Sequence, residues 1–369
     1  MTTYTSTRRK ESIVQRIGAF ITPHGFGHAT RSIAVLEALQ HRLPDLGIDI
    51  CTTIPKYLFA ESLVNVTLHP VVPDVGLVQH NALVNDLPAT VAALDALLPF
   101  PEEQIASLAL TLKGCSCILC DIAPLGILVA ERMGIPSILV ENFTWDWIYQ
   151  PYIAKCPELK PHAQNLAVIY RRATLHIQTE PVCNPIPGTR TCPPVFRKAR
   201  TGPEKIREHI GAGTRKIVLV SLGGIDFTLP GWQQLKRMTD CLFVLAGQQE
   251  NRLITQNCLA ISRQSQLYHP DLIKAADLVV FKSGYSTAAE CLQAGTRAVC
   301  ITRPTFAESR VLGRFVQEKL DGTLLDEEAF LAGTWIDQLP ELLLQPRPQP
   351  ATFNGADCIA DLLLPLISR

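Results

Sequence analysis

Residues 116–142 read SCILCDIAPLGILVAERMGIPSILVEN: a short aliphatic run, a segment of helical period and a second short run. The same alternation recurs along the chain, which predicts a parallel sheet with helices on both faces. Before residue 180, the other predicted strands are IGAFIT from Ile17, IDICTTI from Ile48, VTLHPVV from Val66 and TLHIQT from Thr174.

A second cycle of strands and helices follows residue 203. Its predicted strands are KIVLVSLGG from Lys216, CLFVLAG from Cys241, LVVFKSG from Leu278 and RAVCITRP from Arg297. Between the cycles, residues 181–203 are rich in proline and lack apolar periodicity. We interpret them as a stiff extended connection that contains no helix or strand.

The predicted fold class is therefore α/β, with two doubly wound Rossmann-like domains that face each other across a cleft. We expect a disordered tail at 1–12, a first domain at 13–180, the connection at 181–203, a second domain at 204–350, and a helix within 351–369 that packs back onto the first domain.

Composition narrows the class of protein. The 34 Lys and Arg balance the 34 Asp and Glu, so no overall field favours nucleic acid as a partner. Polar residues interrupt every apolar run before the roughly 18 residues that a transmembrane segment needs. No apolar signal core follows the basic N-terminus, so we expect a cytoplasmic protein. Its 12 cysteines are then expected to be reduced, with no structural disulfide.

The loop TPHGFGHATR, residues 22–31, follows the first predicted strand and should reach the cleft. Gly25 and Gly27 allow a tight turn and a close approach to a ligand, and the next helix begins with unpaired N–H groups. His28 at this helix start is a candidate general base. The alternative is that His24 and His28 only form and cap the turn.

The helix after this loop has an apolar stripe that should pack on the sheet, formed by Ile33, Leu36, Leu39 and Leu43. We expect its opposite face to be solvated, and that face carries Arg31, Glu37 and Gln40.

Asp121 ends the strand SCILCDI and should reach the same edge as His28. A carboxylate that accepts the Nδ1 proton of a histidine fixes its tautomer, so the two residues form a candidate catalytic dyad. The alternative is that Asp121 caps the helix that begins near Leu125. The nearby cysteines at 115, 117 and 120 point to opposite sides of a strand and are not expected to bind metal.

The segment FKSGYSTAAE, residues 281–290, combines a strand end, a Ser-Gly turn and a helix start that carries hydroxyl groups. Such a turn can donate hydrogen bonds to a diphosphate, and Glu290 can accept from both hydroxyls of a ribose. The alternative is a capping box, with Ser286 or Thr287 as the cap and Glu290 near N3. The residues predicted here to contact a nucleotide are Ser283, Gly284, Tyr285, Ser286, Thr287 and Glu290.

Other strand ends add candidates of lower specificity. Gly223 and Gly224 in SLGGID can approach a phosphate or simply make a turn. Arg303 can meet a phosphate and Glu308 a sugar hydroxyl, unless they lie on an exposed helix face. The aromatic residues of NFTWDWIY, residues 142–149, suit either an acceptor pocket or core packing.

Four stretches of the sequence resemble the glycosyltransferase-like N-terminal region of plant arabinokinases. They are GFGHATR, residues 116–149, PPVFRKAR and HPDLIKAADLVVFKSGYSTAAECLQAG. More distantly, the chain is similar to inverting GT-B glycosyltransferases. The resemblance implies that His28 is the acceptor-activating base and Asp121 its supporting carboxylate. It also implies that Ser283 to Thr287 form the diphosphate loop, behind which Glu290 binds ribose.

The sequence departs from the plant-type pattern where that family has a tryptophan that stacks on the base. Only Leu267 and Tyr268 stand near that place, so we take Tyr268, together with Gly27 of the first loop, as further nucleotide-contacting residues. A nucleotide-sugar hydrolase with a GxGHxxR start also matches Gly25, Gly27, His28 and Arg31.

These observations predict an inverting glycosyltransferase that transfers a sugar from a nucleoside diphosphate sugar, most simply a UDP-sugar, to the hydroxyl of a small-molecule or lipid-linked acceptor. The chain has no Asp-x-Asp pair, so we expect no metal ion and no cofactor besides the donor substrate. A hydrolase of the same fold and a non-catalytic nucleotide-sugar-binding protein are the alternatives.

Overall fold

The computed structural model describes residues 15–79, 85–223, 232–303 and 305–368. The predicted tail at 1–12 lies outside these residues. The described part of the chain forms two sheets, of which the first has seven parallel strands. In spatial order they are β3 (Val66–His69), β2 (Gly47–Cys51), β1 (Arg16–Ile21), β4 (Ile118–Asp121), β5 (Ser137–Glu141), β6 (Leu175–Thr179) and β7 (Arg190–Cys192).

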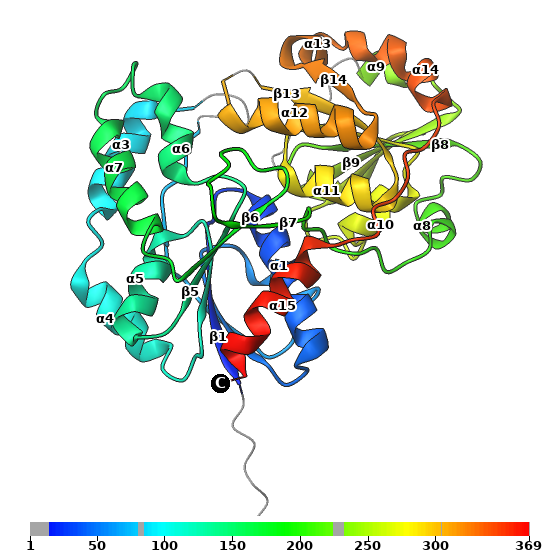
Figure 1. The fold of residues 1–369 in the computed structure, drawn as a ribbon. Helices are drawn as coiled ribbons and strands as arrows, with labels where there is room; N and C mark the ends of the chain where they lie inside the picture. Colours follow the sequence, from blue (N-terminus) through cyan, green and yellow to red (C-terminus); the bar gives the residue numbers. More distant parts are fainter. Residues whose placement is uncertain (1–14, 80–84, 224–231, 304, 369) are drawn as a thin grey trace, which may run out of the picture.

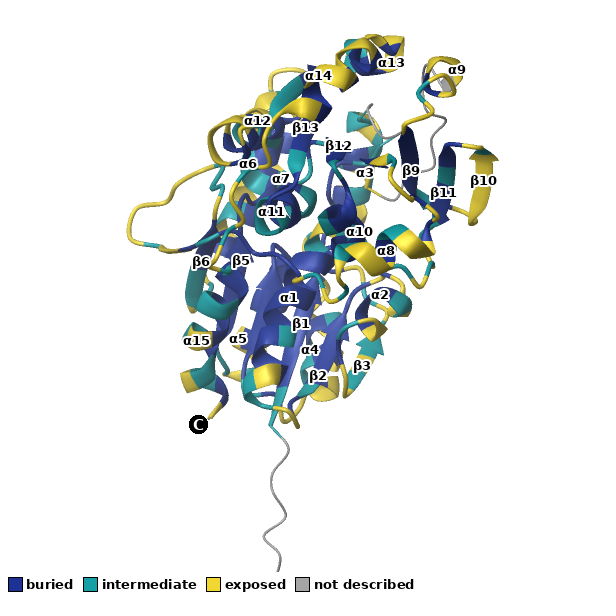
Figure 2. Cartoon of the chain, turned by 90° about the vertical axis from the view of Figure 1, so that its right-hand side faces the viewer, coloured by how far each residue is buried: buried dark blue, intermediate teal, exposed yellow. Residues whose placement is uncertain are grey.

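The second sheet also has seven strands, of which β10 alone pairs antiparallel. The order is β10 (Arg252–Thr255), β11 (Cys258–Ser262), β9 (Cys241–Gln248), β8 (Lys216–Ser221), β12 (Leu278–Lys282), β13 (Arg297–Thr302) and β14 (Thr323–Asp326). Figure 2 shows β10 exposed at the edge of this sheet, while the central strands are buried.

Helices cover both faces of each sheet (Figure 1). In the first half of the chain they are α1 (Phe26–Arg42), α2 (Lys56–Ala60), α3 (Leu87–Leu97), α4 (Glu102–Thr111), α5 (Pro124–Met133), α6 (Trp145–Tyr149) and α7 (Leu159–Tyr170). In the second half they are α8 (Pro203–His209), α9 (Trp232–Leu235), α10 (His269–Ala275), α11 (Tyr285–Ala294), α12 (Ala307–Leu320), α13 (Glu327–Ala332), α14 (Leu339–Leu344) and α15 (Gly355–Ile367), with single 3₁₀ turns at Gln150–Tyr152 and Thr334–Gln338.

Strand β1 illustrates why the central strands are mostly apolar. Ala19 and Ile21 pack on the side of α1 and α15, whereas Phe20 packs in the core on the side of α4, α5 and α7. Because successive side chains of a strand point to opposite faces, a strand covered on both faces is apolar at nearly every position along its middle. The predicted two-sheet α/β architecture is confirmed.

The prediction that the connection contains no strand is wrong, because β7 lies within it and adds to the edge of the first sheet beside β6. Strands β10, β11 and β14 were not predicted. Two of them are only four residues long, and β10 is largely exposed. Short edge strands have little apolar signal, since only part of their surface is buried.

The final helix, α15, returns to the first domain and packs against α1, where Ile359 and Leu363 are buried in the same core as Ile33. This return also overturns the expectation of no disulfide. Cys358 of α15 is bonded to Cys192 of β7, with their Cα atoms 6.0 Å apart. The two cysteines are 166 residues apart in sequence, so only the folded structure shows that they meet.

No helix within the described ranges is long and apolar enough to cross a lipid bilayer.

Candidate active site

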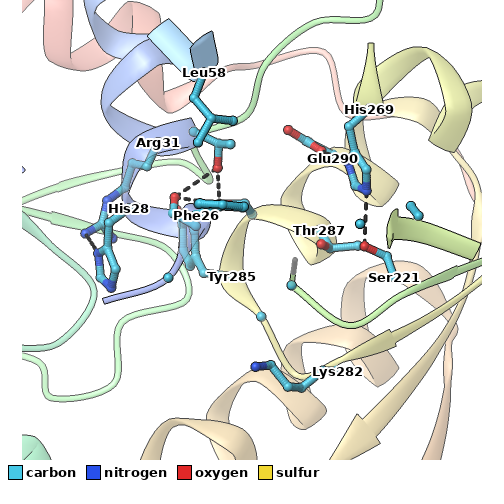
Figure 3. A pocket seen from close by; sticks show the side chains of 18 of the residues that line it. Phe26, His28, Arg31, Leu58, Ser221, His269, Lys282, Tyr285, Thr287 and Glu290 are labelled. Atoms are coloured by element: carbon cyan, nitrogen blue, oxygen red, sulfur yellow. Dashed lines mark hydrogen bonds and ion pairs between the residues drawn. The ribbon is translucent and has the colours of Figure 1, made fainter. Parts of the chain in front are cut away.

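A cavity of about 460 Å³ lies between the two domains, where the carboxyl ends of both sheets meet. The first domain lines it with the loop after β1 and the start of α1, including His28. The second domain contributes the loop after β12 and the start of α11. Figure 3 shows His28 and Arg31 on one side of this space and Lys282 and Thr287 on the other. The cavity therefore lies where doubly wound folds bind ligands.

His28 lies in the first turn of α1, which begins after Gly25. Gly25 has φ +91°, a conformation that favours glycine and lets the loop turn sharply into the helix. The Nδ1 atom of His28 is 2.8 Å from Asp121 Oδ1. Because an ionised carboxylate only accepts hydrogen bonds, this contact places a proton on Nδ1 and makes Nε2 the ring nitrogen that can accept a proton in the neutral form of His28.

Asp121 is buried at the end of β4 and accepts several hydrogen bonds. Arg31 donates to both of its oxygens, from Nε to Oδ2 at 2.8 Å and from Nη2 to Oδ1 at 2.6 Å, and Ser32 donates to Oδ2. Burial alone would raise the pKa of Asp121, but Arg31 and His28 lower it to about 2. The alternative reading of Asp121 as a helix cap does not hold, since α5 has Ala123 at its N-cap.

The prediction that Arg31 and Gln40 lie on a solvated helix face is wrong. Arg31 is 2% exposed and also donates to Asn142 Oδ1, and Gln40 is buried. Arg31 bonds to Asp121 and lies over the Tyr285 ring of the second domain, while Gln40 donates to the carbonyls of Leu46 and Val64. A single amphipathic pattern cannot reveal such partners. Glu37 remains partly exposed.

In the aromatic segment after β5, some residues pack in the core and one lines the cavity, so each of the two interpretations, core packing and acceptor pocket, holds for part of it. Trp145 and Tyr149 are buried, and their polar atoms donate to Asp74 Oδ2 and to the carbonyl of Val75. These two residues pack in the core. Phe143, by contrast, lines the cavity, with its ring edge-on to His28 at a centroid distance of 5.8 Å.

The loop between β12 and α11 supplies backbone and hydroxyl groups to the cavity. Helix α11 has Gly284 at its N-cap and no side-chain cap, so the capping-box alternative does not hold. Thr287 lines the cavity. Ser286 also lines it, and its Oγ donates to the Gly27 carbonyl at 2.8 Å and accepts from Thr30. This residue therefore connects the two domains directly.

Other predicted donor-site residues have partners within the protein. Ser283 donates to Ser309 Oγ. Tyr285 accepts from the backbone N–H of Val195 and lies under the Arg31 guanidinium. Tyr268 does not line the cavity, although its neighbours Leu267 and His269 do. The Tyr268 ring instead packs against the guanidinium groups of Arg197 and Arg200.

Glu290 lies at the cavity wall but is 2% exposed. Arg197 Nε donates to its Oε1 at 2.8 Å, and His269 Nδ1 lies 3.1 Å from its Oε2. Burial opposes ionisation, yet Arg197 and His269 hold the pKa of Glu290 below its usual range. The opposite nitrogen of His269 is 3.1 Å from Ser221 Oγ.

Cations gather near the end of β12 and β13. Lys282 lines the cavity, and burial lowers its pKa to about 8. Its ammonium group lies close to Gly223, which has φ +75° and also lines the cavity. Arg303 is buried over the Phe306 ring, and its Nη2 is 3.8 Å from Glu308 Oε1. Gly224 lies outside the described residues.

Several residues of the cavity wall were not among the predicted site residues, among them Arg31, Arg197, His269 and Lys282. Lys282 directly precedes the predicted turn at Ser283, so its position at a strand end was a usable signal. Both arginines lie in motifs quoted above, GxGHxxR and PPVFRKAR, but their roles were not detectable, because their carboxylate partners lie about 90 residues away in sequence.

This pair of facing domains defines the class: the protein is α/β with the two-domain GT-B fold of glycosyltransferases. The chain is similar to the glycotransferase of kitacinnamycin, at 17% identity and a TM-score of 0.61, covering 96% of this chain and 99% of that one. It is also similar to Phytolacca americana UGT2, whose structure holds UDP-2-fluoro-glucose and pterostilbene, at 12% identity and a TM-score of 0.60, covering 96% and 100%.

Among proteins compared by sequence, the chain is 26% identical over 358 residues to L-arabinokinase of Arabidopsis thaliana. The match covers 93% of this chain but only 34% of the arabinokinase, so the chain spans about a third of that protein's length. No protein-family model matches the chain. The chain thus has the GT-B fold and is similar in sequence to part of a plant arabinokinase.

Proposed function

We propose that this protein is an inverting, metal-independent glycosyltransferase that acts in the cytoplasm. It transfers a sugar from a nucleoside diphosphate sugar, a UDP-sugar, to a hydroxyl group of a small-molecule or lipid-linked acceptor. The observation that carries the proposal is the His28–Asp121 hydrogen bond at the wall of a cavity whose other side is the helix start of α11. The UDP-2-fluoro-glucose bound in the Phytolacca structure supports the choice of donor.

In this reaction His28 is the general base. Its Nδ1 proton is held by Asp121, so Nε2 accepts the proton of the acceptor hydroxyl as that oxygen attacks the anomeric carbon. The bond from the anomeric carbon to the diphosphate oxygen breaks on the opposite face, which inverts the configuration. His28 leaves the step as an imidazolium beside Asp121, and the diphosphate leaves with the bonding electron pair.

The second domain binds the donor. Its cavity wall faces the departing diphosphate and stabilises its charge through Lys282, Arg303, Gly223 and the N–H groups at the start of α11. Glu290 accepts hydrogen bonds from the ribose hydroxyls, and Glu308 from the sugar. These roles match the chemistry of each group at the cavity wall.

The test is release of nucleoside diphosphate from a panel of UDP-, GDP-, TDP- and ADP-sugars, with and without a metabolite extract as the source of acceptor. A transferase releases UDP only with the extract. Release from the UDP-sugar alone would show a hydrolase, and binding without release would show a non-catalytic protein; either result would contradict the proposal.

The base is tested by His28→Ala. Removing a general base lowers turnover by about 10²- to 10⁴-fold, while the donor should still bind. His162→Ala is the matched control, because His162 also pairs with a carboxylate, Asp95, but lies outside the cavity. Turnover that survives in His28→Ala would exclude His28 as the base.

A further inference from the structure

The connection between the domains contributes a buried cation to the donor side of the cavity. Arg197 belongs to this connection, is 4% exposed, and lines the cavity together with Glu290. Its Nε donates to Glu290 Oε1 at 2.8 Å. A buried arginine and a buried glutamate each lose hydration, so each depends on the other as a partner.

The second oxygen of Glu290 is held as well. His269 Nδ1 lies 3.1 Å from Oε2, and the other ring nitrogen of His269 lies 3.1 Å from Ser221 Oγ. The carboxylate is therefore fixed from two sides, by one residue of the connection and one residue at the start of α10. Each carboxylate oxygen can accept more than one hydrogen bond, so both can still accept from a ligand hydroxyl.

The segment that carries Arg197 is held by both domains. Its guanidinium and that of Arg200 pack on the Tyr268 ring, with carbon-to-centroid distances of 5.1 and 4.2 Å. Arg200 reaches the first domain, where it donates to Glu37 at 2.8 Å and to Ser62 at 2.6 Å. The segment that carries Arg197 therefore has little freedom to move without breaking contacts to one domain or the other.

We infer that Arg197 is a positioning residue of the donor pocket: by fixing Glu290, it directs the carboxylate toward the ribose hydroxyls and makes the pocket prefer ribonucleotides to 2′-deoxyribonucleotides. This inference rests on the proposed function, because it takes Glu290 as the ribose-binding acid. Arg197 does not touch the reacting atoms and acts through Glu290. Specificity for ribose then depends on the connection between the domains as well as on the donor domain.

The experiment measures the dissociation constants of UDP and 2′-deoxy-UDP by calorimetry for each protein. For the wild type, we expect UDP to bind about 10-fold or more tightly than 2′-deoxy-UDP, because a hydrogen bond from the 2′ hydroxyl to a charged acceptor is lost. In Arg197→Gln the preference should fall to about 3-fold or less. Glu290→Gln should reduce it similarly.

Lys198→Gln is the matched control. Lys198 is the next residue of the connection, is exposed, and pairs with Asp357 of α15, so the ribose preference should stay at the wild-type value. A purely structural role of Arg197 would weaken both nucleotides equally and leave their ratio unchanged. If Arg197→Gln does not fold, Arg197→Lys keeps the charge without the planar guanidinium, and its ratio should lie between those of the wild type and Glu290→Gln.

Two results would overturn the inference, and they are distinguishable. UDP binding with an unchanged ratio in the folded Arg197 variants would exclude the positioning role while the proposed function stands. Failure of the wild-type protein to bind UDP would contradict the proposed donor, and the positioning role would fail with it.

Discussion

Asp121 binds both His28 and the buried Arg31, so the catalytic role proposed for it and its structural role are linked at the scale of single residues. Arg31 has only 2% of its surface exposed and finds its carboxylate partner in Asp121. Removing one partner of a buried ion pair leaves an uncompensated charge. A loss of activity in an Asp121 variant would therefore not by itself reveal a catalytic role.

We predict that Asp121→Asn lowers the free energy of unfolding by about 3–5 kcal/mol, because Arg31 loses its charged partner. His28→Ala leaves the Arg31–Asp121 pair intact and should cost clearly less. Urea denaturation followed by circular dichroism measures both. Equal stability of the two variants would show that the buried pair contributes little.

Asp74 gives a pH-dependent prediction at the same scale. Burial raises its pKa to about 7, although Trp145 and Thr22 donate hydrogen bonds to it. A carboxyl group whose pKa is raised by folding stabilises the fold fully below about pH 4, which is near the pKa of an aspartate in the unfolded chain. This stabilisation is lost as the pH rises to about 7, the pKa in the fold.

Relative to Asp74→Asn, the wild-type protein should thus lose stability between pH 4 and pH 7. The total loss is about 4 kcal/mol, since each pH unit between these limits contributes about 1.4 kcal/mol. Urea unfolding of both proteins across this range is the measurement. Parallel stability curves would mean that Asp74 ionises normally in the fold.

At the scale of elements, the start of α15 is packed tightly against the interdomain connection. The Gly355 N–H donates to the Pro194 carbonyl at 2.9 Å, and a Cβ atom at Gly355 would lie 2.0 Å from the Pro193 carbonyl oxygen. Glycine is needed here because two backbones approach each other closely.

Gly355→Ala should therefore destabilise the protein by at least about 1–3 kcal/mol, the usual cost of overpacking, because backbone must move. The control is Asp361→Ala on the exposed face of α15, which removes only a surface pair with Arg42 and should cost at most about 1 kcal/mol. Thermal unfolding of both variants is the comparison, and a wild-type melting temperature for Gly355→Ala would exclude the tight contact.

At the scale of the whole molecule, the cavity is complete only when the two domains are together. Ser286 of the second domain bonds to Gly27 and Thr30 of the first, and Tyr152 donates to the Thr305 carbonyl across the same gap. A ligand that fills the cavity contacts both domains and should stabilise the molecule as a whole.

We predict that UDP at 100 times its dissociation constant stabilises the protein by about 2.7 kcal/mol in a thermal-shift assay. Lys282→Gln should weaken UDP binding by about 10-fold or more, because a charged contact to the diphosphate is lost, and leave uridine binding unchanged. If Lys282→Gln weakened the binding of uridine and of UDP equally, Lys282 would not contact the diphosphate.

The sequence by itself determined the alternation of strands and helices, the fold class, and the two loops that supply His28 and the start of α11. These features are encoded locally, in apolar periodicity and in the position of glycines and polar residues at strand ends. Asp121 was predictable for the same reason, since it ends a strand next to the one that leads to His28.

Only the tertiary structure decided which partners these residues have. The Arg31–Asp121 and Arg197–Glu290 pairs and the Cys192–Cys358 bond join segments from 90 to 166 residues apart. Partners so distant in sequence explain why Arg31 was placed on a solvated face. Tyr268 was expected in the pocket because its actual partners, Arg197 and Arg200, also lie far from it in sequence. Such contacts depend on how whole elements pack, and local sequence patterns carry no record of the element that lies opposite.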